Sequence, residues 1–337
     1  MRDSITLSCG KRLLASIAIV ASSWAVGQDL HLFRIGTGGV GGTYYPIGSL
    51  VAQAISQPPD AARCQDTDRC GVPGLVAVAQ SANGSVSNVT AVGEGLLESG
   101  FSQSDVAHWA HQGTGIFADK DAFTKLRAIA GLYPETIHLV ARRDSGIRTI
   151  RDLRGKRVSL DEPGSGTLVD ARLVLDAHGL SESDIEPEYI KPDLAGERMR
   201  AGELDAFFIV AGHPVTSIRR LAGSTDILVV PIEGEPRKTL LERHEFFSEG
   251  RIEPGTYDGV GETPTMSVHA MWVTHMDVEA ELIYRITRAL WNQNARELLD
   301  NGHVKGKEIR LEHALNGVAI PLHPGAERFY REREMIP

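Results

Sequence analysis

The chain has 337 residues, of which 42% are hydrophobic and 23% charged, and its formal net charge at pH 7 is −9. A chain of this length exceeds one simple hydrophobic core and suits two lobes. Because no basic residues cluster, neither nucleic acid nor an anionic membrane is an expected partner.

The first 27 residues have the layout of a secretory signal peptide. Basic residues precede an apolar run over 13–21, and small residues at 25–27 offer a cleavage site. The run is shorter than the roughly 20 residues that a membrane-spanning helix needs. A buried N-terminal helix is the weaker alternative. We therefore expect an exported protein, whose charge without the leader would be about −11.

Two cysteines, Cys64 and Cys70, follow in the polar stretch "RCQDTDRCG". In an oxidising compartment, this spacing predicts a local disulfide. A metal site would need further ligands nearby, and no His, Cys or Glu supplies them. No bound metal is therefore expected.

Apolar runs alternate with amphipathic stretches along the chain, which predicts an α/β protein with mainly parallel sheets. Strands are expected at 31–35, 74–79, 127–132, 137–142, 156–160, 205–210, 227–231 and 266–273. Helices are expected at 46–56, 86–98, 105–111, 149–153, 167–178, 194–202, 236–243 and 278–300.

The stretch "HLFRIGTGGVGGTYYP" over 31–46 contains the G-x-G-x-x-G spacing of dinucleotide-binding folds. In such a fold the helix would continue through Pro46, where a proline removes a donor and clashes. Pro46 fits better in the first position of a helix. The acidic residue expected about 20 positions later is also missing. We expect neither a nucleotide nor any other cofactor.

Four glycine-rich or serine-rich turns each follow an apolar run and open a helix, at 38–46, 81–87, 100–105 and 162–167. Ligands of open α/β sheets bind beyond the carboxyl ends of the strands, where such turns gather. Helix N-termini attract anions through free N–H groups and a partial positive charge, so an acidic chain can still hold a carboxylate. Each turn alone could be an ordinary capped helix, but four together favour a shared site. The predicted N-caps are Ser85, Ser104, and Ser165 or Thr167.

These same segments resemble the TAXI class of TRAP-transporter solute-binding proteins, the periplasmic immunogenic proteins of bacteria. The resemblance runs from about residue 33 to 330 and rests on motifs such as "RIGTGGVGGTYYPIGSLVA", "GFSQSDVAHWA" and "DLRGKRVSLDEPGSGT". It implies a monomeric, two-lobed periplasmic binding protein of type II-like fold, with two mainly parallel sheets joined by two hinge strands. The lobes would comprise 28–140 plus 266–337 and 141–265, with hinges near 140–145 and 262–268.

The resemblance also implies the ligand and the partner. The solute would be a small carboxylate, such as glutamate, glutamine or a 2-oxoglutarate-like dicarboxylate, delivered to an integral-membrane TRAP permease that uses an ion gradient. The family's pocket segments map onto Gly42, Thr43, Tyr44, Tyr45, Asn83, Gly84, Ser85, Gln103, Ser104, Asp105, Gly164, Ser165, Gly166, Thr167, His213 and Pro214.

At two of these positions, the sequence does not decide which class of ligand binds. Relatives often read Gly-Gly-Tyr-Pro where this chain has a histidine, so His213 could replace a pocket tyrosine or could be a surface or hinge residue. Asp105 could receive an ammonium if it points inward, which would favour an amino acid. If it only supports its helix start, a plain dicarboxylate fits better.

Two other classes of function are considered. A secreted hydrolase could use Ser165, but "EPGSGT" is not G-x-S-x-G and no His–Asp pair stands beside it. The paired histidines His108 and His111 lack an acidic partner, and His244-Glu245 does not continue as a zinc-protease motif. We therefore expect no catalytic residues. A host-facing antigen or adhesin remains the third alternative.

Overall fold

The computed structural model describes residues 30–59, 61 and 69–337. The predicted leader over 1–27 and Cys64 lie outside these residues, so the signal peptide and the disulfide stay predictions. Within the described ranges, no helix is both long and apolar enough to cross a membrane.

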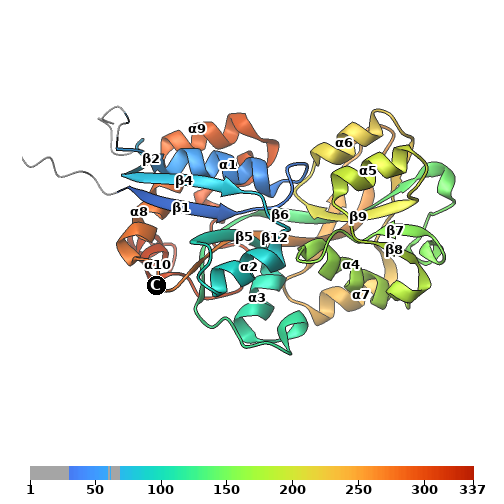
Figure 1. Ribbon diagram of the computed structural model, residues 1–337, viewed down its shortest axis with the longest axis horizontal. Helices are drawn as coiled ribbons and strands as arrows, with labels where there is room; N and C mark the ends of the chain where they lie inside the picture. Colours follow the sequence, from blue (N-terminus) through green and yellow to red (C-terminus); the bar gives the residue numbers. More distant parts are fainter. Residues whose placement is uncertain (1–29, 60, 62–68) are drawn as a thin grey trace, which may run out of the picture.

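The chain folds into two lobes that lie side by side along the long axis of the molecule (Figure 1). The first lobe contains β1 (His31–Gly36), α1 (Tyr44–Ile55), β2 (Ser56–Gln57), β3 (Val72–Pro73), β4 (Leu75–Gln80), α2 (Ser85–Gly93), β5 (Ser99–Gln103), α3 (Ser104–Gln112), α8 (Ala280–Leu290), α9 (Gln293–Gly302) and α10 (Pro324–Glu332). The second lobe contains β7 (Arg157–Ser159), α4 (Gly166–Ala177), β8 (Glu186–Glu188), α5 (Pro192–Arg200), β9 (Ala206–Ala211), α6 (Thr216–Ala222), β10 (Ile227–Val229), α7 (Gly234–Arg243) and β11 (Ser248–Ile252).

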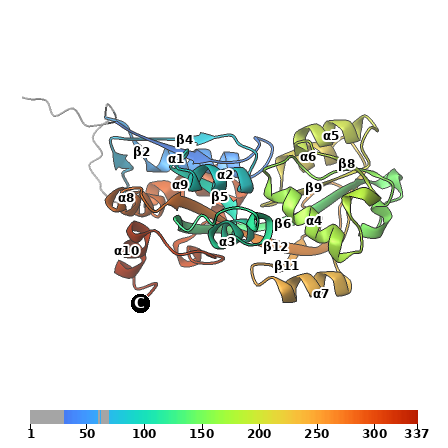
Figure 2. The same cartoon turned by 60° about the horizontal axis from the view of Figure 1, so that its bottom comes forward.

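Two long strands, β6 (Leu126–Arg142) and β12 (Thr263–His275), run through both lobes and pair antiparallel with each other. The strand order is β4-β1-β5-β12-β6-β9-β7-β8, with β10 added to β6 and β11 added to β12. The turned view shows both lobes attached to this central pair (Figure 2). The predicted two-lobed α/β fold with two connecting strands is confirmed.

The sheet differs from the prediction in its centre. The outer strands β4-β1-β5 and β9-β7-β8 are parallel, whereas β5, β12, β6 and β9 pair antiparallel. The strands predicted separately at 127–132 and 137–142 are one strand, because β6 continues through Pro134. The two predicted sheets are therefore hydrogen-bonded into one.

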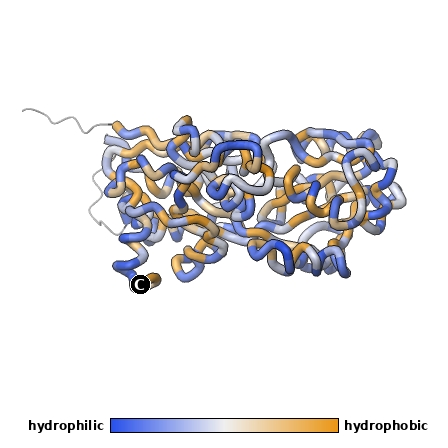
Figure 3. Tube along the Cα trace, turned by 90° about the horizontal axis from the view of Figure 1, so that it is seen from below, coloured by the Kyte–Doolittle hydropathy of each residue, from blue (hydrophilic) through white to orange (hydrophobic). Residues whose placement is uncertain are grey.

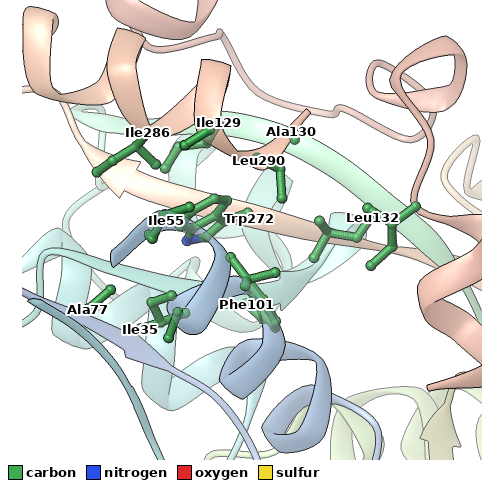
Figure 4. Packing of buried hydrophobic residues seen from close by; sticks show 14 of the residues in the cluster. Ile35, Ile55, Ala77, Phe101, Ile129, Ala130, Leu132, Trp272, Ile286 and Leu290 are labelled. Carbon is green, nitrogen blue, oxygen red and sulfur yellow. The ribbon is translucent and has the colours of Figure 1, made fainter. Parts of the chain in front are cut away.

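Each lobe has its own hydrophobic core. In the first lobe, Trp272 of β12 is fully buried and meets Phe33 and Phe101 edge to face, with ring centroids 6.3 and 6.2 Å away. Figure 4 shows Trp272 and Phe101 among the buried residues of this core. Along β6 the buried side chains change from this core, at Tyr133, to that of the second lobe, at Ile137. Apolar segments accordingly recur inside both lobes (Figure 3).

Several predicted elements need correction. The helix predicted over 278–300 is two helices, since Asn292 accepts a hydrogen bond from the Ala295 amide (2.8 Å) and caps α9. The helix predicted over 86–98 ends at Gly93, after which β5 begins. The helix predicted over 149–153 is a short 3-10 turn. The prediction lacks strands β2, β3, β5, β8 and β11 and helices α6 and α10.

Candidate functional site

A cavity of about 70 Å³ lies between the two lobes, where the turns at the ends of several strands meet. Most of the predicted pocket residues line it: Gly42, Thr43, Tyr44, Asn83, Gly84, Ser85, Gln103, Ser165, Gly166 and Thr167. The other predicted residues lie outside its lining: Tyr45, Ser104, Asp105, Gly164, His213 and Pro214. Contact of any of them with a solute stays a prediction.

Two helices of the first lobe, α1 and α2, begin at the cavity. The first turn of a helix leaves N–H groups without intrahelical acceptors. Neither N-cap residue, Thr43 of α1 nor Gly84 of α2, covers these groups with a side chain. The Thr43 hydroxyl donates instead to the Gly212 carbonyl across the cleft (2.7 Å). This wall of the cavity therefore presents amide donors.

The serine caps predicted in the first lobe are wrong. Helix α2 begins at Ser85 itself, and the Ser85 hydroxyl accepts from the Gln103 amide (3.1 Å), which joins the two turns. Helix α3 likewise begins at Ser104, and the hydroxyl of that residue is buried without a partner among the described residues. Both serines lie one position later than a cap.

Helix α4 of the second lobe is capped as predicted, because the Ser165 hydroxyl accepts from the Leu168 amide (3.1 Å). An acid that the prediction missed, Asp161, lies just ahead of this helix and lines the cavity. Its carboxylate accepts from the Glu162 amide (2.8 Å). Burial raises the pKa of Asp161 to about 7, although the Glu162 amide and the hydroxyls of Thr167 and Ser165 lower it.

The backbone of Asp161 has φ +69°, in the left-handed region that few non-glycine residues adopt. Aspartate and asparagine tolerate this region better than other side chains. In the sequence, Asp161 looks like an ordinary acidic residue of a surface turn. Its position between a strand end and the "PGSG" turn is the one sequence signal that could have identified it as a site residue.

A second missed acid, Glu135, reaches the cavity from the long strand β6. Its side chain is 1% exposed, and the Tyr44 hydroxyl donates to its Oε2 atom (2.7 Å). Burial raises the pKa of Glu135 to about 8; the Tyr44 hydrogen bond lowers it, and the charge of Asp105 raises it further. The prediction placed a break between two strands here, which hid an inward-facing carboxyl.

Behind the cavity, Asp105 of α3 and Asp170 of α4 form a buried acid pair across the two lobes. Burial raises the pKa of Asp105 to about 6. The pKa of Asp170 is raised well above its ordinary value, by burial first and then by the charge of Asp105. Gln103 donates to Asp170 (2.8 Å). Because two adjacent buried carboxylates repel each other, one member of the pair retains a proton.

The lobes touch each other around the cavity. The Ser87 amide donates to the Gly164 carbonyl (2.9 Å), and the Asn83 side chain donates to the Pro163 carbonyl (3.1 Å). A Cβ atom on Gly166 would overlap the side-chain amide of Gln103. The structure therefore shows the closed arrangement of the two lobes.

His213 lies behind the cavity, next to the strands that join the lobes. Its Nδ1 atom is 3.0 Å from the Thr136 hydroxyl, and its ring centroid is 6.0 Å from that of His138. Burial lowers the pKa of His213 to about 4, so the imidazole is neutral at pH 7. The ring therefore lies against β6 outside the cavity lining, and the role of His213 stays open between pocket, hinge and surface.

Charged side chains of the second lobe complete the lining. Lys191 pairs with Glu162 (Nζ–Oε1 3.1 Å), and the Asp193 carboxylate packs against Gly41 of the first lobe. In the part of the chain that the structure describes, no group of three or more His, Cys, Asp or Glu is arranged to hold a metal ion. The cavity therefore combines amide donors with carboxyl groups.

Comparison with known proteins gives the family. A family model described as the NMT1-like family matches residues 35–333. A protein of Bordetella bronchiseptica RB50 of known structure is 16% identical, with 87% of this chain and 83% of that chain covered and a TM-score of 0.52. The alkanesulfonate-binding protein SsuA from Xanthomonas axonopodis pv. citri, bound to MOPS, is 18% identical over 90% and 84% of the two chains (TM-score 0.47). A putative L-cystine ABC transporter from Listeria monocytogenes is 14% identical over 84% and 100% (TM-score 0.48).

Identities this low bear on the fold alone, and the match over 35–333 bears on the family. The chain belongs to the NMT1-like family, and it shares its two-lobed α/β fold with the Bordetella protein.

Proposed function

We propose that this protein is an extracytoplasmic solute-binding protein that closes its two lobes over a small carboxylate. The observation that carries the proposal is the cavity between the lobes, at which the uncapped N-termini of α1 and α2 begin. Binding of anions by amide groups at helix N-termini needs no surface cation. It therefore suits a chain with a formal charge of −9.

In this proposal, the solute carboxylate accepts hydrogen bonds from the amides of Thr43, Tyr44 and Ser85. The Tyr44 ring, which is 8% exposed and borders the cavity, would cover the apolar part of the solute. The division between lobes would lie between Tyr133 and Ile137 on β6, where the core changes, rather than at residue 140. Closure would then bend β6 and β12.

The partner would be an integral-membrane permease. The TAXI-like motifs favour a TRAP-type permease, and the signal-peptide layout of residues 1–27 favours a periplasmic location, with a disulfide between Cys64 and Cys70 and a monomeric state. A hydrolase is disfavoured because the Ser165 hydroxyl already accepts from the Leu168 amide and no histidine lines the cavity among the described residues.

Titration calorimetry of the purified mature protein tests the proposal. The panel contains amino acids, monocarboxylates, dicarboxylates and, as an uncharged comparison, the amides of the same acids. We expect at least one small carboxylate to bind with a dissociation constant in the micromolar range or below and to raise the melting temperature. Small-angle scattering should show a more compact particle with that solute. If no carboxylate binds, the proposed function is wrong.

A further inference from the structure

We propose that Glu135 and Asp161 determine the charge of the solute, so that the cleft accepts one carboxylate joined to a cationic or hydrogen-bond-donating head group and excludes dicarboxylates. An ammonium group is the simplest such head. This inference rests on the proposed function and adds the class of solute to it.

Glu135 provides a buried acceptor that lacks a full set of protein donors. The carboxyl lines the cavity with 1% of the residue exposed, and among the described residues only the Tyr44 hydroxyl donates to it, at Oε2. A carboxylate can accept about four hydrogen bonds. A buried carboxylate with one donor is costly unless a ligand supplies more. A cationic head group against Oε1 would satisfy this need.

Asp161 lies beside the N-terminus of α4, where a second solute carboxylate would otherwise approach. Its carboxyl accepts from the Glu162 amide, ahead of the helix, and is hydrogen-bonded to the hydroxyls of Thr167 and Ser165 at the helix start. The N-terminus of this helix, unlike those of α1 and α2, therefore has an acid of the chain beside it, whose charge opposes a second anion. Only one wall of the cavity is left for a solute anion.

The charges around the cavity lead to the same conclusion. Glu135, Asp161, Glu162 and Asp193 line the cavity, and Lys191 is the one cation among the described lining residues. Lys191 already pairs with Glu162. Asp193 pairs with Arg220 (3.9 Å), so Glu135 and Asp161 are the two lining acids without an ion pair among the described residues, although the charge of Lys305 also acts on Glu135. Above the raised pKa values of these two acids, a second solute carboxylate would approach their charges in a partly desolvated site, where like charges repel strongly. A cationic head would instead find two acceptors.

The test uses pairs of solutes that match in shape. L-glutamine and L-glutamate differ in one amide against one carboxylate, and 2-aminobutyrate and butyrate differ in the ammonium. Calorimetry is done at pH 8.5, above the raised pKa values of both acids. We expect glutamine to bind at least tenfold more tightly than glutamate, and 2-aminobutyrate at least tenfold more tightly than butyrate.

Two variants assign these preferences to residues. Asp161→Asn keeps a side chain that tolerates φ +69° and removes the charge. It should therefore reduce the ratio of the affinity for glutamine to the affinity for glutamate at least fivefold. Glu135→Gln should reduce the ratio of the affinity for 2-aminobutyrate to the affinity for butyrate by a similar factor. Asp176→Asn, an exposed acid near the far end of α4, is the matched control and should change neither ratio.

The outcomes separate the two proposals. If glutamate or another dicarboxylate binds as tightly as its matched amide, or if the ratios in Asp161→Asn and Glu135→Gln equal those of the control, the inference on charge is wrong and the solute-binding function stands. If no member of either solute pair and no carboxylate of the wider panel binds, both proposals are wrong.

Discussion

The two walls of the cavity are built from the same local element, a turn at a strand end followed by a helix, yet they differ in charge. In the first lobe, α1 and α2 begin without a side-chain cap and leave amide donors at the cavity. In the second lobe, α4 is capped by Ser165 and preceded by the buried acid Asp161. The comparison shows that a glycine-rich turn before a helix is not enough to identify an anion site, since a nearby acid of the chain changes the charge at the helix start.

The largest effect is expected from Gly166→Ala, which acts where the walls touch. The new methyl group would overlap the side-chain amide of Gln103, which is held in place by its hydrogen bond to Asp170 (2.8 Å). Closure should be blocked, so we expect at least a hundredfold loss of solute affinity in calorimetry, with the circular dichroism spectrum unchanged. The control Gly196→Ala lies on α5, where an added Cβ meets nothing within 4 Å, and should bind normally. Normal binding by Gly166→Ala would show that the walls separate when solute is bound.

Tyr44→Phe tests the link between the amide-rich wall and Glu135. The substitution removes the hydroxyl that donates to Glu135 and leaves a buried carboxyl without that donor, which should lower the free energy of unfolding by about 2 kcal/mol. Urea unfolding measures the change. The neighbouring Tyr45→Phe is the control, because Tyr45 is half-buried outside the cavity lining and should change stability by less than about 0.5 kcal/mol. Equal effects of the two variants would contradict a special role for the Tyr44 hydroxyl.

The acids of the cleft predict how stability depends on pH. Burial raises the pKa values of Glu135 to about 8 and of Asp161 to about 7, whereas these groups titrate near pH 4 in the unfolded chain. The native state therefore binds more protons between these limits, and the free energy of unfolding falls as the pH rises. Burial also lowers the pKa values of His138, to about 3, and of His213, to about 4, which has the opposite effect below about pH 6.5.

The clean window is thus pH 7.5 to 8.5, where histidines are almost entirely neutral in the folded and in the unfolded state. Without solute, we expect the free energy of unfolding to fall by about 1 kcal/mol across this window, as measured by urea unfolding. Glu135→Gln should make the dependence flatter, and Asp176→Asn should leave it unchanged. A stability that rises with pH across the window in the parent protein would contradict the raised pKa values.

The smallest effect concerns the caps of the two walls. Ser165→Ala removes the hydroxyl that accepts from the Leu168 amide and should cost about 1 kcal/mol in the free energy of unfolding. Ser85→Ala removes no helix cap, because Gly84 holds the N-cap position of α2, but it leaves the buried Gln103 amide without its acceptor and should cost a similar amount. Thermal unfolding measures both changes. Unchanged stability of Ser165→Ala would contradict its role as the cap of α4.

Much of the fold was predictable because it depends on local patterns. Alternating apolar and amphipathic segments predict two α/β lobes, and the turns near residues 42, 84 and 166 do meet at one cavity. Strand β5 ("SGFSQ") was missed because its small and polar residues are buried by neighbours far away in the sequence. The long strand β6 was divided in two because Pro134 resembles a strand end.

The acids of the site could not be predicted in the same way. Nothing in the sequence around Glu135 or Asp161 distinguishes an inward carboxyl from one that faces solvent, because their burial depends on both lobes. Asp105 was proposed as a pocket residue, but it packs against Asp170 of the other lobe, which is 65 positions away in the sequence. Pairings of this kind are set by tertiary packing alone.

The path of β6 and β12 has a consequence for biogenesis. The second lobe is a continuous insertion between these strands, while β12 lies between β5 and β6 in the sheet of the first lobe. During synthesis, which starts at the N-terminus, the second lobe can thus be completed before β12 exists. At that stage the sheet of the first lobe still lacks a strand in its middle. Until residues 263–275 arrive, β5 keeps an unpaired edge, and a chaperone or an export factor that holds the chain in that interval would find its target there.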